Sequence, residues 1–418
     1  MTPFVPRRDL FRLAALLAGG ALLPGCAGPA AQPTVSGGEV ALSHVPRTSP
    51  VGLVPTSLGS FAAALLDGLG GGNAVVSPVS VAAVLAMLGN GAAGATRAEF
   101  ERVLGSGLAA LNEEVGTVLQ ALQDAGSRHG LQLTLVDAVW GQRGLAWQQA
   151  YLDALAAWYG AGVRQVDFRT DPAAAMAAIN AWGDQATRGL IPSIVDASMI
   201  TSDTRLAVAN AIHFKGAWEG QFDPARTVTA PFTTGSGARV DAQLMVGDQT
   251  RPWRDTRFWS GTMLPFAGGE LAMALLLPKP DAPASLAALT AEEGFPELLG
   301  ASSAPLRLAV PRWRARTKAQ LREPLVALGL RRAFDAGADF SAMTTTERLF
   351  VHFVAHEATI TVDETGAEAA AVTVGGVGVE SAPQPHRVLR LDRPFHWAIL
   401  HTATGTPLFL GRVDDPTR

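Results

Sequence analysis

A stretch of twenty residues near the C-terminus constrains the fold of this chain more than any other feature. It reads VDETGAEAAAVTVGGVGVES, from Val362 to Ser381. The stretch lies between two strand-like segments, FVAHEATITV (353–362) and HRVLRL (386–391), yet its Ala, Gly and Thr side chains are too small to anchor a hydrophobic core. It must therefore be either exposed or buried in an unusual way.

The composition allows a large core and argues against nucleic acid as a partner. The 418 residues are 48% hydrophobic and 17% charged, with a formal net charge of -4. A chain of this length corresponds to two or three domains, or to one large domain that mixes helices and strands. No basic stripe with interleaved aromatic residues occurs in the sequence, so we expect no nucleic-acid partner.

The N-terminal residues 1–26 resemble an export signal. An Arg pair at 7–8 is followed by an apolar stretch at 13–23, which is too short for a stable membrane span. The Arg pair resembles a twin-arginine signal. Cys26 follows Leu23-Pro24-Gly25 and resembles the acylated cysteine of a bacterial lipobox. The alternative is an ordinary cleaved signal with an incidental cysteine.

These features predict a protein of the cell envelope or the extracellular space, held to a membrane by a lipid on Cys26. Cys26 is the only cysteine, so no disulfide can form within the chain and packing alone must stabilise the fold. Residues 27–52 are rich in Pro, Ser, Thr and Gly, which predicts a flexible tether. The folded domain is then expected to span residues 53–418.

Local patterns predict helices mainly in the first half of the chain and strands mainly in the second. A helix is expected after a Ser57 cap, and another after Ser77-Pro78, because Pro suits a first helical turn. Thr96 with Glu99 predicts a capping box. Further helices are expected at 151–160 and 173–191, and strands at 131–141, 205–214, 270–280, 305–313, 353–362, 387–391, 396–401 and 407–413. This segregation predicts an α+β fold.

The sequence contains no recognisable catalytic or metal-binding constellation. A Gly-x-Ser-x-Gly elbow and a phosphate loop that ends in Gly-Lys-Ser/Thr are both absent. His356-Glu357 begins like a zinc-protease motif, but Ile360 stands where the second His would have to lie. The other His residues are scattered singly, as structural or solvated histidines usually are. We therefore expect no enzymatic activity, no metal and no cofactor.

Five segments of the chain follow one another in an order that is typical of one family. They read NAVVSPVSVAAVLAMLGNGAAG (73–94), INAWGDQATRGLI (179–191), VANAIHFKGAWEGQF (208–222), HEATITVDETGAEAAAVT (356–373) and PFHWAILHTATGTPLFLGRVDDP (394–416). Each resembles a segment of the serpins, and the resemblance extends over residues 55–418. It implies helices, a large central mixed β-sheet, smaller sheets and an exposed reactive-centre loop at about residues 364–390.

The resemblance also explains the small residues after Val362. It implies that a protease cleaves the reactive-centre loop, which then inserts as a new strand into the large sheet and carries the acylated protease with it. Because strand side chains alternate between faces, the inward set would be small and uncharged. That set is Ala367, Ala369, Ala371 and Thr373, and the outward set is Glu368, Ala370 and Val372. The expected hinge is Glu364, Gly366, Ala367, Glu368, Ala369, Ala370, Ala371 and Thr373.

By the same resemblance, a polar cluster lies under the central strands where the sheet opens. Its expected members are Ser77, Ser80, Asn210 and His356, and Trp218 with Glu364 is expected where the loop enters the sheet. Buried polar groups of this kind are also common as plain structural features, each satisfied by hydrogen bonds. Both interpretations can hold together, since a hydrogen-bonded contact can also release.

The reactive bond is located by counting from the hinge glycine. Glu380 lies fourteen residues after Gly366, so the family pattern implies cleavage of Glu380–Ser381. That bond would suit a glutamyl-specific serine protease. Cleavage of Val379–Glu380 would suit an elastase-like or subtilisin-like enzyme, and it stays open because the nearby glycines allow several backbone conformations.

The sequence therefore predicts an inhibitor of serine proteases that acts as a suicide substrate, forms a covalent complex with its target and is a monomer. The alternative is a non-inhibitory serpin that acts as a binding or scaffold protein on the cell envelope. The small, apolar hinge favours inhibition, because an unpaired charge on its inward face would cost several kcal/mol on insertion.

Overall fold

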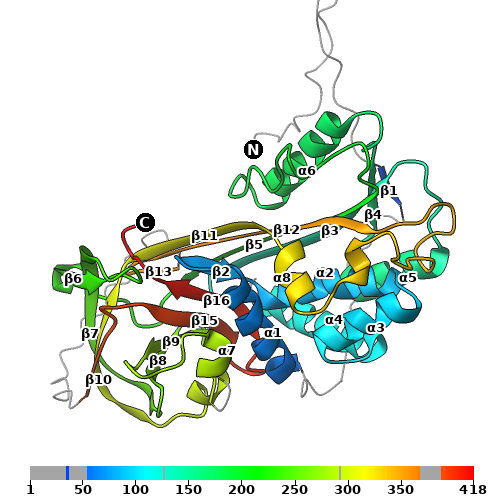
Figure 1. The fold of residues 1–418 in the computed structure, drawn as a ribbon. Coiled ribbons are helices and arrows are strands. Elements are labelled where there is room, and N and C mark those ends of the chain that lie inside the picture. Colours follow the sequence, from blue (N-terminus) through cyan, green and yellow to red (C-terminus); the bar gives the residue numbers. More distant parts are fainter. Residues whose placement is uncertain (1–33, 37–53, 126–127, 291–292, 368–386) are drawn as a thin grey trace, which may run out of the picture. The chain divides into compact units, whose positions relative to one another are not determined.

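The computed structural model describes residues 34–36, 54–125, 128–290, 293–367 and 387–418. They fall within one compact unit, Pro33–Arg418, and the other unit, Met1–Gln32, lies outside the described residues. The described residues form helices, a seven-stranded sheet and a nine-stranded network of strands (Figure 1). The predicted α+β class is confirmed.

The long helices all come early in the chain. They are α1 (Val54–Gly68), α2 (Pro78–Gly91), α3 (Gly94–Leu104), α4 (Leu108–Ala125), α5 (Gln149–Tyr159) and α6 (Pro172–Ala186). The later ones are short: α7 (Leu286–Leu289), α8 (Arg322–Ala327) and the 3-10 turns Pro224–Arg226, Phe295–Leu298 and Arg332–Phe334. Helix α2 is buried along nearly its whole length because its side chains are apolar or small all round.

Helix α2 begins where the sequence predicts. Ser77 is its N-cap and accepts a hydrogen bond from the backbone N–H of Ser80 at 3.4 Å, while Pro78 occupies the first helical position. The prediction for α1 is displaced. That helix begins at Val54, ahead of Ser57, so Ser57 lies inside the helix and is not its cap.

The capping box predicted for α3 is wrong. The helix begins before Thr96 and has no side-chain cap. Thr96 Oγ1 instead accepts the backbone N–H of Asp339 at 2.9 Å, and Glu99 Oε2 accepts the N–H groups of residues 331–332 at 2.8 Å each. Both side chains therefore bind a segment that is distant in the sequence, and a local motif cannot reveal such contacts.

The seven-stranded sheet contains the two strands between which a further strand can enter. Its order is β1 (Thr34–Ser36), β4 (Val163–Val166), β3 (Gln132–Gln142), β5 (Leu206–Ala217), β13 (Gly366–Ala367), β12 (Val351–Val362) and β11 (Trp313–Gln320). Strands β5 and β12 pair directly and in parallel over eight residue pairs, from Leu206–Val351 to His213–Thr359. We call this line of parallel pairing the β5–β12 seam. Beyond it, β13 lies between the two strands.

The other described strands pair with one another in a second network. The long strand β7 (Arg239–Asp255) joins them, since it pairs with β6 over residues 239–244, with β10 over residues 244–252 and with β8 over residues 253–255. The network follows the order β14 (Arg387–Arg390), β10 (Ser303–Pro311), β7, β8 (Trp259–Pro265), β9 (Leu271–Pro278), β15 (Phe395–His401), β16 (Pro407–Val413) and β2 (Ala74–Val76), with β6 (Val228–Thr233) on β7.

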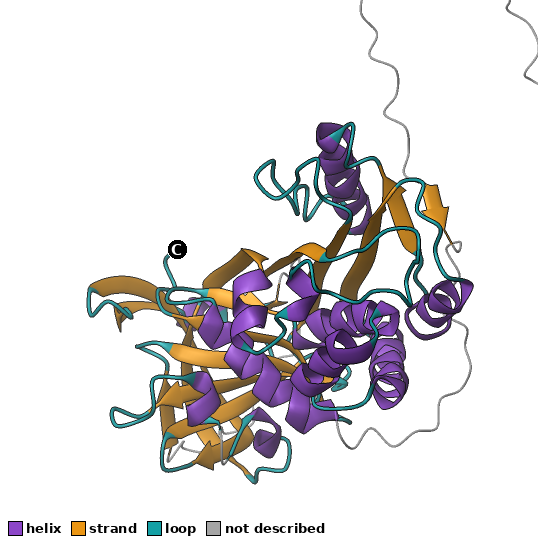
Figure 2. Cartoon of the chain, turned by 45° about the vertical axis from the view of Figure 1, so that its right-hand side comes forward, coloured by secondary structure: helices purple, strands orange, loops and turns teal. Residues whose placement is uncertain are grey.

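The two faces of the seven-stranded sheet pack against different helices. Figures 1 and 2 show α6 on one face, while α2 and its neighbouring helices lie on the other. The main core includes the interior of α2, and a second core forms under α6 around Trp140, Phe168, Ile179 and Phe353. Alternate side chains of β5 and β12 enter the two cores, which is why nearly every residue of both strands is buried.

One strand lies in the segment predicted to be a flexible tether. Residues Thr34–Ser36 form β1 and pair antiparallel with the edge strand β4, from Thr34–Gln165 to Ser36–Val163. The pairing covers the free edge of β4 with backbone hydrogen bonds. Three residues without a distinctive sequence give no local signal of such a contact.

Candidate functional site

The chain reverses direction immediately after β12. Asp363 forms this turn: its Oδ1 accepts the backbone N–H of Thr365 at 2.8 Å and that of Gly366 at 3.2 Å. The N–H of Asp363 donates to the carbonyl oxygen of Gly366 at 3.0 Å. Aspartate side chains that bind the backbone two residues on are typical of tight turns. The turn sends the chain back along the sheet as β13.

The first residues of the predicted hinge already lie in the sheet. On β5, Gly366 pairs with Ala217 and Ala367 pairs with Gly216, while on β12 Ala367 pairs with Val362. A Cβ atom at position 366 would overlap the carbonyl oxygen of Gly216, so the close approach of the two backbones requires glycine. Ala367 is fully buried and belongs to the main core.

Trp218 lies at the end of β5 and holds the turn. Its indole Nε1–H donates to the carbonyl oxygen of Asp363 at 2.9 Å. Its backbone N–H donates to the carbonyl oxygen of Thr365, also at 2.9 Å. The indole ring stacks on Phe266, with ring centroids 4.6 Å apart and an interplanar angle of 19°. Trp218 therefore fixes the place at which the hinge enters the sheet.

Glu364 ties the same turn to the segment between β10 and β11. Its carboxylate accepts hydrogen bonds from Nε and Nη2 of Arg312, the shortest at 2.6 Å, and from the hydroxyl of Thr227. Burial acts to raise the pKa of Glu364, but the hydrogen bonds from Arg312 and Thr227 outweigh it and hold the pKa below its ordinary value. The carboxylate is therefore ionised at neutral pH.

The structure brings Ser77, Ser80, Asn210 and His356 together beneath the middle of the sheet. The two serines lie at the start of α2, and Asn210 and His356 lie opposite each other across the β5–β12 seam. The N–H of Ser77 donates to Nε2 of His356 at 3.3 Å, and Nδ1 of His356 lies 2.5 Å from Oδ1 of Asn210. Asn210 Nδ2 donates to the hydroxyl of Ser80. We call this group the seam cluster.

The hydrogen bonds of the seam cluster define the state of its histidine. Burial lowers the pKa of His356 to about 4, so the imidazole is neutral at pH 7. Because Nε2 accepts the N–H of Ser77, the ring proton is on Nδ1 and points at Oδ1 of Asn210. This contact between Asn210 and His356 joins two side chains from opposite sides of the seam.

Asp137, on β3, is a member of the seam cluster that the sequence analysis missed. Its Oδ1 accepts hydrogen bonds from Nδ2 of Asn210 and, at 3.0 Å, from the hydroxyl of Ser80. Desolvation raises the pKa of Asp137 to about 7, although both hydrogen bonds act to lower it. A signal was present in the sequence, since Asp137 is the one charged residue within the strand-like segment 131–141.

Several predicted site residues lie outside the described residues. They are the hinge residues Glu368, Ala369, Ala370, Ala371 and Thr373, the reactive-bond candidates Val379, Glu380 and Ser381, and Cys26. The bonds of the reactive-centre loop and the lipid on Cys26 stay predictions. In the part of the chain that the structure describes, no helix is long and apolar enough to cross a bilayer, and no group of His, Cys, Asp and Glu side chains could hold a metal ion.

The geometry of the site allows one strand to enter between β5 and β12. The turn at Asp363 and the pair Gly366–Ala367 have started that strand, and further entry has to separate the parallel pairing of the seam. Separation also breaks the contact of Asn210 with His356, because the two side chains belong to different strands. The described site thus holds an entry point with a hydrogen-bonded cluster beyond it.

Comparisons with known proteins agree with this arrangement. The family described as serpin (serine protease inhibitor) matches residues 59–416. The chain is 32% identical over 360 residues to serpin-Z2B of Triticum aestivum, covering 82% of this chain and 90% of that one. It is 30% identical over 362 residues to the leukocyte elastase inhibitor of Bos taurus, covering 82% and 93%.

A solved structure shares the fold as well. The native state of the thermophilic serpin tengpin aligns with a TM-score of 0.83 and 24% identity, covering 92% of this chain and all of that one. The family match and the two relatives each extend over most of the chain. The chain therefore belongs to the serpin family.

Proposed function

We propose that this protein inhibits serine proteases as a suicide substrate. A target protease cleaves the reactive-centre loop and is acylated by it, and the loop inserts between β5 and β12 before the acyl-enzyme can hydrolyse. The observation that carries the proposal is the position of Gly366 and Ala367, which pair with β5 and β12 as the beginning of an inserted strand. The similarity to a leukocyte elastase inhibitor supports it.

The change in strand pairing supplies a driving force. Insertion replaces one parallel ladder of eight residue pairs by two antiparallel ladders, one with β5 and one with β12. Antiparallel pairing is the more stable kind per residue, and each added backbone hydrogen bond contributes about 0.5–1.5 kcal/mol net. The intact protein keeps this free energy unreleased because the uncut loop is tied at both ends.

The proposed location is the cell envelope or the extracellular space, with a lipid on Cys26 as membrane anchor. The proposal is supported by the Arg pair, the apolar stretch and Leu23-Pro24-Gly25-Cys26. Growth with a labelled fatty acid tests it: the wild-type protein is expected to carry label and to enter the detergent phase. A Cys26→Ser variant should do neither, and an unlabelled wild type would overturn the anchor.

Incubation with a panel of serine proteases tests the inhibition. Elastase-like, subtilisin-like and glutamyl-specific enzymes cover both candidate bonds, Glu380–Ser381 and Val379–Glu380. The expected product is a covalent complex that survives boiling in detergent, together with a released C-terminal peptide whose first residue identifies the bond. Clean cleavage by every enzyme without any complex would contradict inhibition and favour a binding or scaffold protein.

The variant Ala367→Arg separates cleavage from insertion. Ala367 is fully buried between β5 and β12, and a guanidinium there would have to be desolvated without a partner. The variant is expected to be cut as fast as the wild type but to form little complex. Ala110→Arg, on the exposed face of α4, is the matched control and should inhibit normally. Equal complex formation by Ala367→Arg would exclude insertion as the mechanism.

A further inference from the structure

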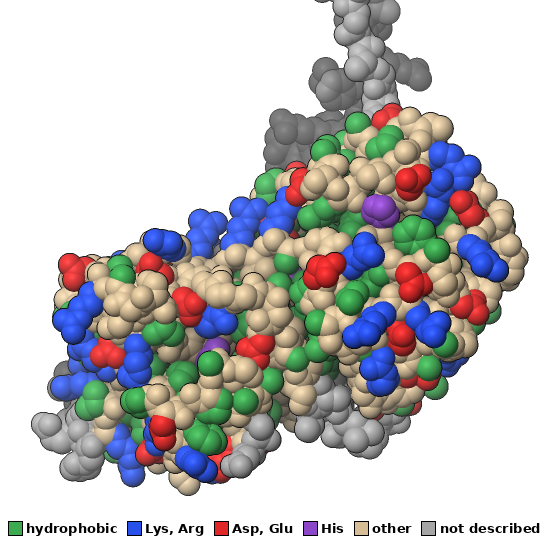
Figure 3. All heavy atoms as spheres, in the orientation of Figure 1, with side chains coloured by type: hydrophobic (Ala, Val, Ile, Leu, Met, Phe, Trp, Pro, Cys, Tyr) green, Lys and Arg blue, Asp and Glu red, His purple; other side chains and the backbone are tan. Residues whose placement is uncertain are grey.

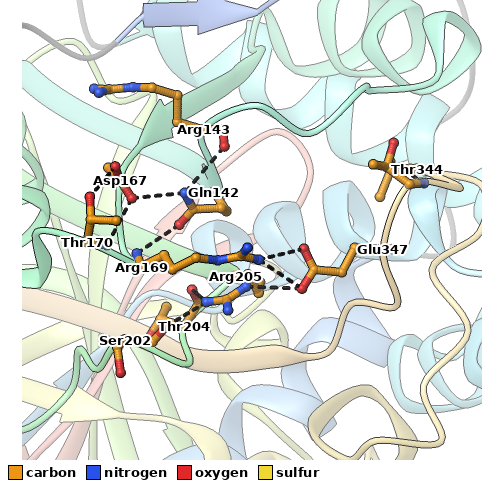
Figure 4. Close-up of polar contacts among 11 residues, drawn as sticks. Gln142, Arg143, Asp167, Arg169, Thr170, Ser202, Thr204, Arg205, Thr344 and Glu347 are labelled. Atoms are coloured by element: carbon orange, nitrogen blue, oxygen red, sulfur yellow. Dashed lines mark hydrogen bonds and ion pairs between the residues drawn. The ribbon is translucent and has the colours of Figure 1, made fainter.

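A cluster of ion pairs spans the β5–β12 seam at the end that is farthest along the strands from the hinge. Glu347 lies between two arginines: its Oε1 accepts Nε–H of Arg205 at 3.2 Å, and its Oε2 accepts Nη2–H of Arg169 at 3.2 Å (Figure 4). We call these three residues the distal ion cluster. It is separate from the seam cluster and from the hinge.

The members of the distal ion cluster come from opposite sides of the seam. Arg169 follows β4, and Arg205 immediately precedes Leu206, the first residue of β5. Glu347 precedes Val351, the first residue of β12. Leu206 and Val351 are also the first pair of the parallel ladder, so the ion pairs lie directly beyond its end. A strand that separates β5 from β12 over their whole length must also separate Glu347 from both arginines.

The arginine side of the cluster is held rigidly. Nη1 of Arg205 donates to the carbonyl oxygens of Ser202 and Thr204 at 2.7 and 2.9 Å. The backbone N–H of Arg169 donates to Oε1 of Gln142 at 3.0 Å, and the N–H of Gln142 donates to the carbonyl oxygen of Arg205 at 2.9 Å. Gln142 thus binds the backbones of both arginines and fixes the ends of β3, β4 and β5 relative to one another.

A second carboxylate completes that side of the cluster. Asp167 accepts hydrogen bonds from Thr170 and, at 3.0 Å, from Nε2 of Gln142, and these hydrogen bonds lower the pKa of Asp167 to about 2. Asp167 therefore stays ionised over the working pH range. It holds Gln142 in place and leaves Glu347 as the carboxylate that receives both arginine side chains.

The glutamate side is anchored to a different part of the molecule. In the segment before β12, the hydroxyl of Thr344 donates to the carbonyl oxygen of Ala146 at 2.6 Å, and the N–H of Gln148 donates to the carbonyl oxygen of Met343 at 2.8 Å. Residues 146–148 lead into α5, which packs against α2 and α4. Glu347 is thereby fixed to the helical layer, whereas Arg205 is fixed to the strand ends next to α6.

We propose that the distal ion cluster holds the far end of the seam closed and is the last contact that an inserting strand has to break. The inference rests on the proposed function, because it concerns insertion of the reactive-centre loop. In the observed register Ala367 lies opposite Gly216, so position 378 of an ideal antiparallel strand would lie opposite Arg205. Insertion over the half of the seam that is nearer the hinge leaves the distal ion cluster intact, and only a nearly full-length strand reaches it.

The size of the effect follows from the exposure of the charges. The side chains of Arg205, Glu347 and Arg169 are 17%, 35% and 54% exposed. Ion pairs of this exposure contribute modestly to stability, and salt weakens them. Loss of the cluster is therefore expected to accelerate full insertion about two- to five-fold, and high salt is expected to accelerate the wild type in the same way.

Annealing of synthetic peptides to the uncut protein tests the proposal. A long peptide with the sequence of residues 368–380 reaches the distal ion cluster, whereas a short one, residues 368–372, does not. Annealing is measured as the rate at which the melting temperature of the mixture rises. Glu347→Gln is expected to anneal the long peptide about two- to five-fold faster than the wild type and the short peptide at the same rate.

Three comparisons make the test specific. Glu293→Gln removes a surface ion pair with Arg254 of similar exposure elsewhere in the molecule, and should leave both rates unchanged. Arg205→Gln should reproduce Glu347→Gln, and the double variant should be no faster than either single one. Salt of about 0.5 M should accelerate the long peptide in the wild type but not in Glu347→Gln.

The outcomes distinguish this inference from the proposed function. Equal acceleration of both peptides by Glu347→Gln, or no acceleration of the long one, would overturn the role of the distal ion cluster while insertion itself stands. If neither peptide anneals to the wild type and the cleaved loop does not raise its melting temperature, the proposed function fails, and the inference with it.

Discussion

At the scale of single residues, the seam cluster combines two groups whose pKa values move in opposite senses from those of the free side chains. His356 is a buried base with a pKa of about 4, and Asp137 is a desolvated acid with a pKa of about 7. Both are therefore favoured in the neutral form, as desolvation requires. The two groups should affect stability in opposite directions as the pH changes.

His356 is expected to make the protein less stable as the solution becomes acidic. Its pKa in the folded state lies below the ordinary value of about 6.5. The contribution of the neutral imidazole to the free energy of unfolding is therefore complete above that pH and is lost as the pH falls towards about 4. The loss is on the order of 3 kcal/mol. Denaturant unfolding between pH 7 and about 4 should show this slope in the wild type and a flatter one in His356→Gln. The same dependence of stability on pH in both proteins would contradict the low pKa of His356.

Asp137 is expected to act in the opposite sense. Its folded pKa lies above the ordinary value, so its contribution is complete below about pH 4 and is lost as the pH rises through about 7. Over that pH range the free energy of unfolding of Asp137→Asn should increase relative to that of the wild type. The expected difference is on the order of 2 kcal/mol after allowance for the partial exposure of Asp137. The same series of unfolding experiments measures this difference. An increase in the stability of the wild type relative to the variant would show instead that the fold stabilises the ionised carboxylate.

At the scale of elements, β11 is the edge strand next to β12, and basic side chains protect it. Arg314, Arg316 and Lys318 are exposed on one face of β11, and Figure 3 shows Lys and Arg side chains along the margin over this strand. Charged side chains on an edge strand discourage pairing with another chain. Arg316 also binds Oε1 of Glu357, a carboxylate on β12 that is 0% exposed, at 2.6 Å.

Removal of Arg316 is expected to destabilise the protein more than removal of the whole pair. Arg316→Met leaves the buried carboxylate of Glu357 without its cation, at a cost of about 2–4 kcal/mol. The double variant Arg316→Met, Glu357→Gln should recover most of that loss because no buried charge remains. Chemical denaturation of the four proteins of this cycle checks the prediction, and additive effects would count against the pair.

The elements also show how far local sequence patterns reach. The start of α2 was predictable because Ser77 and Pro78 act on the residues beside them. The cap of α3 was not, because Thr96 and Glu99 bind a segment more than two hundred residues away. The two-residue strand β13 is set by neighbours on β5 and β12 that only the folded chain brings together. Family motifs placed most of the seam cluster, whereas Asp137 belongs to none of them.

At the scale of the whole molecule, the intact protein is expected to be less stable than its cleaved form. Cleavage frees the loop to add about ten residues of new strand pairing, worth on the order of 10 kcal/mol. For a domain of this size the melting temperature should then rise by roughly 10 °C or more. Calorimetry before and after cutting with a non-target protease measures the rise, and identical melting temperatures would mean that no free energy is stored.

Insertion of one strand between β5 and β12 also determines how the protein can be used. Because only one strand can insert there, each molecule can inhibit once. A molecule in which a strand has already inserted can no longer inhibit. The amount of protease that can be inhibited would then depend on the number of new copies made and not on turnover. A stock of purified protein should lose capacity with storage time even while its chain remains uncut.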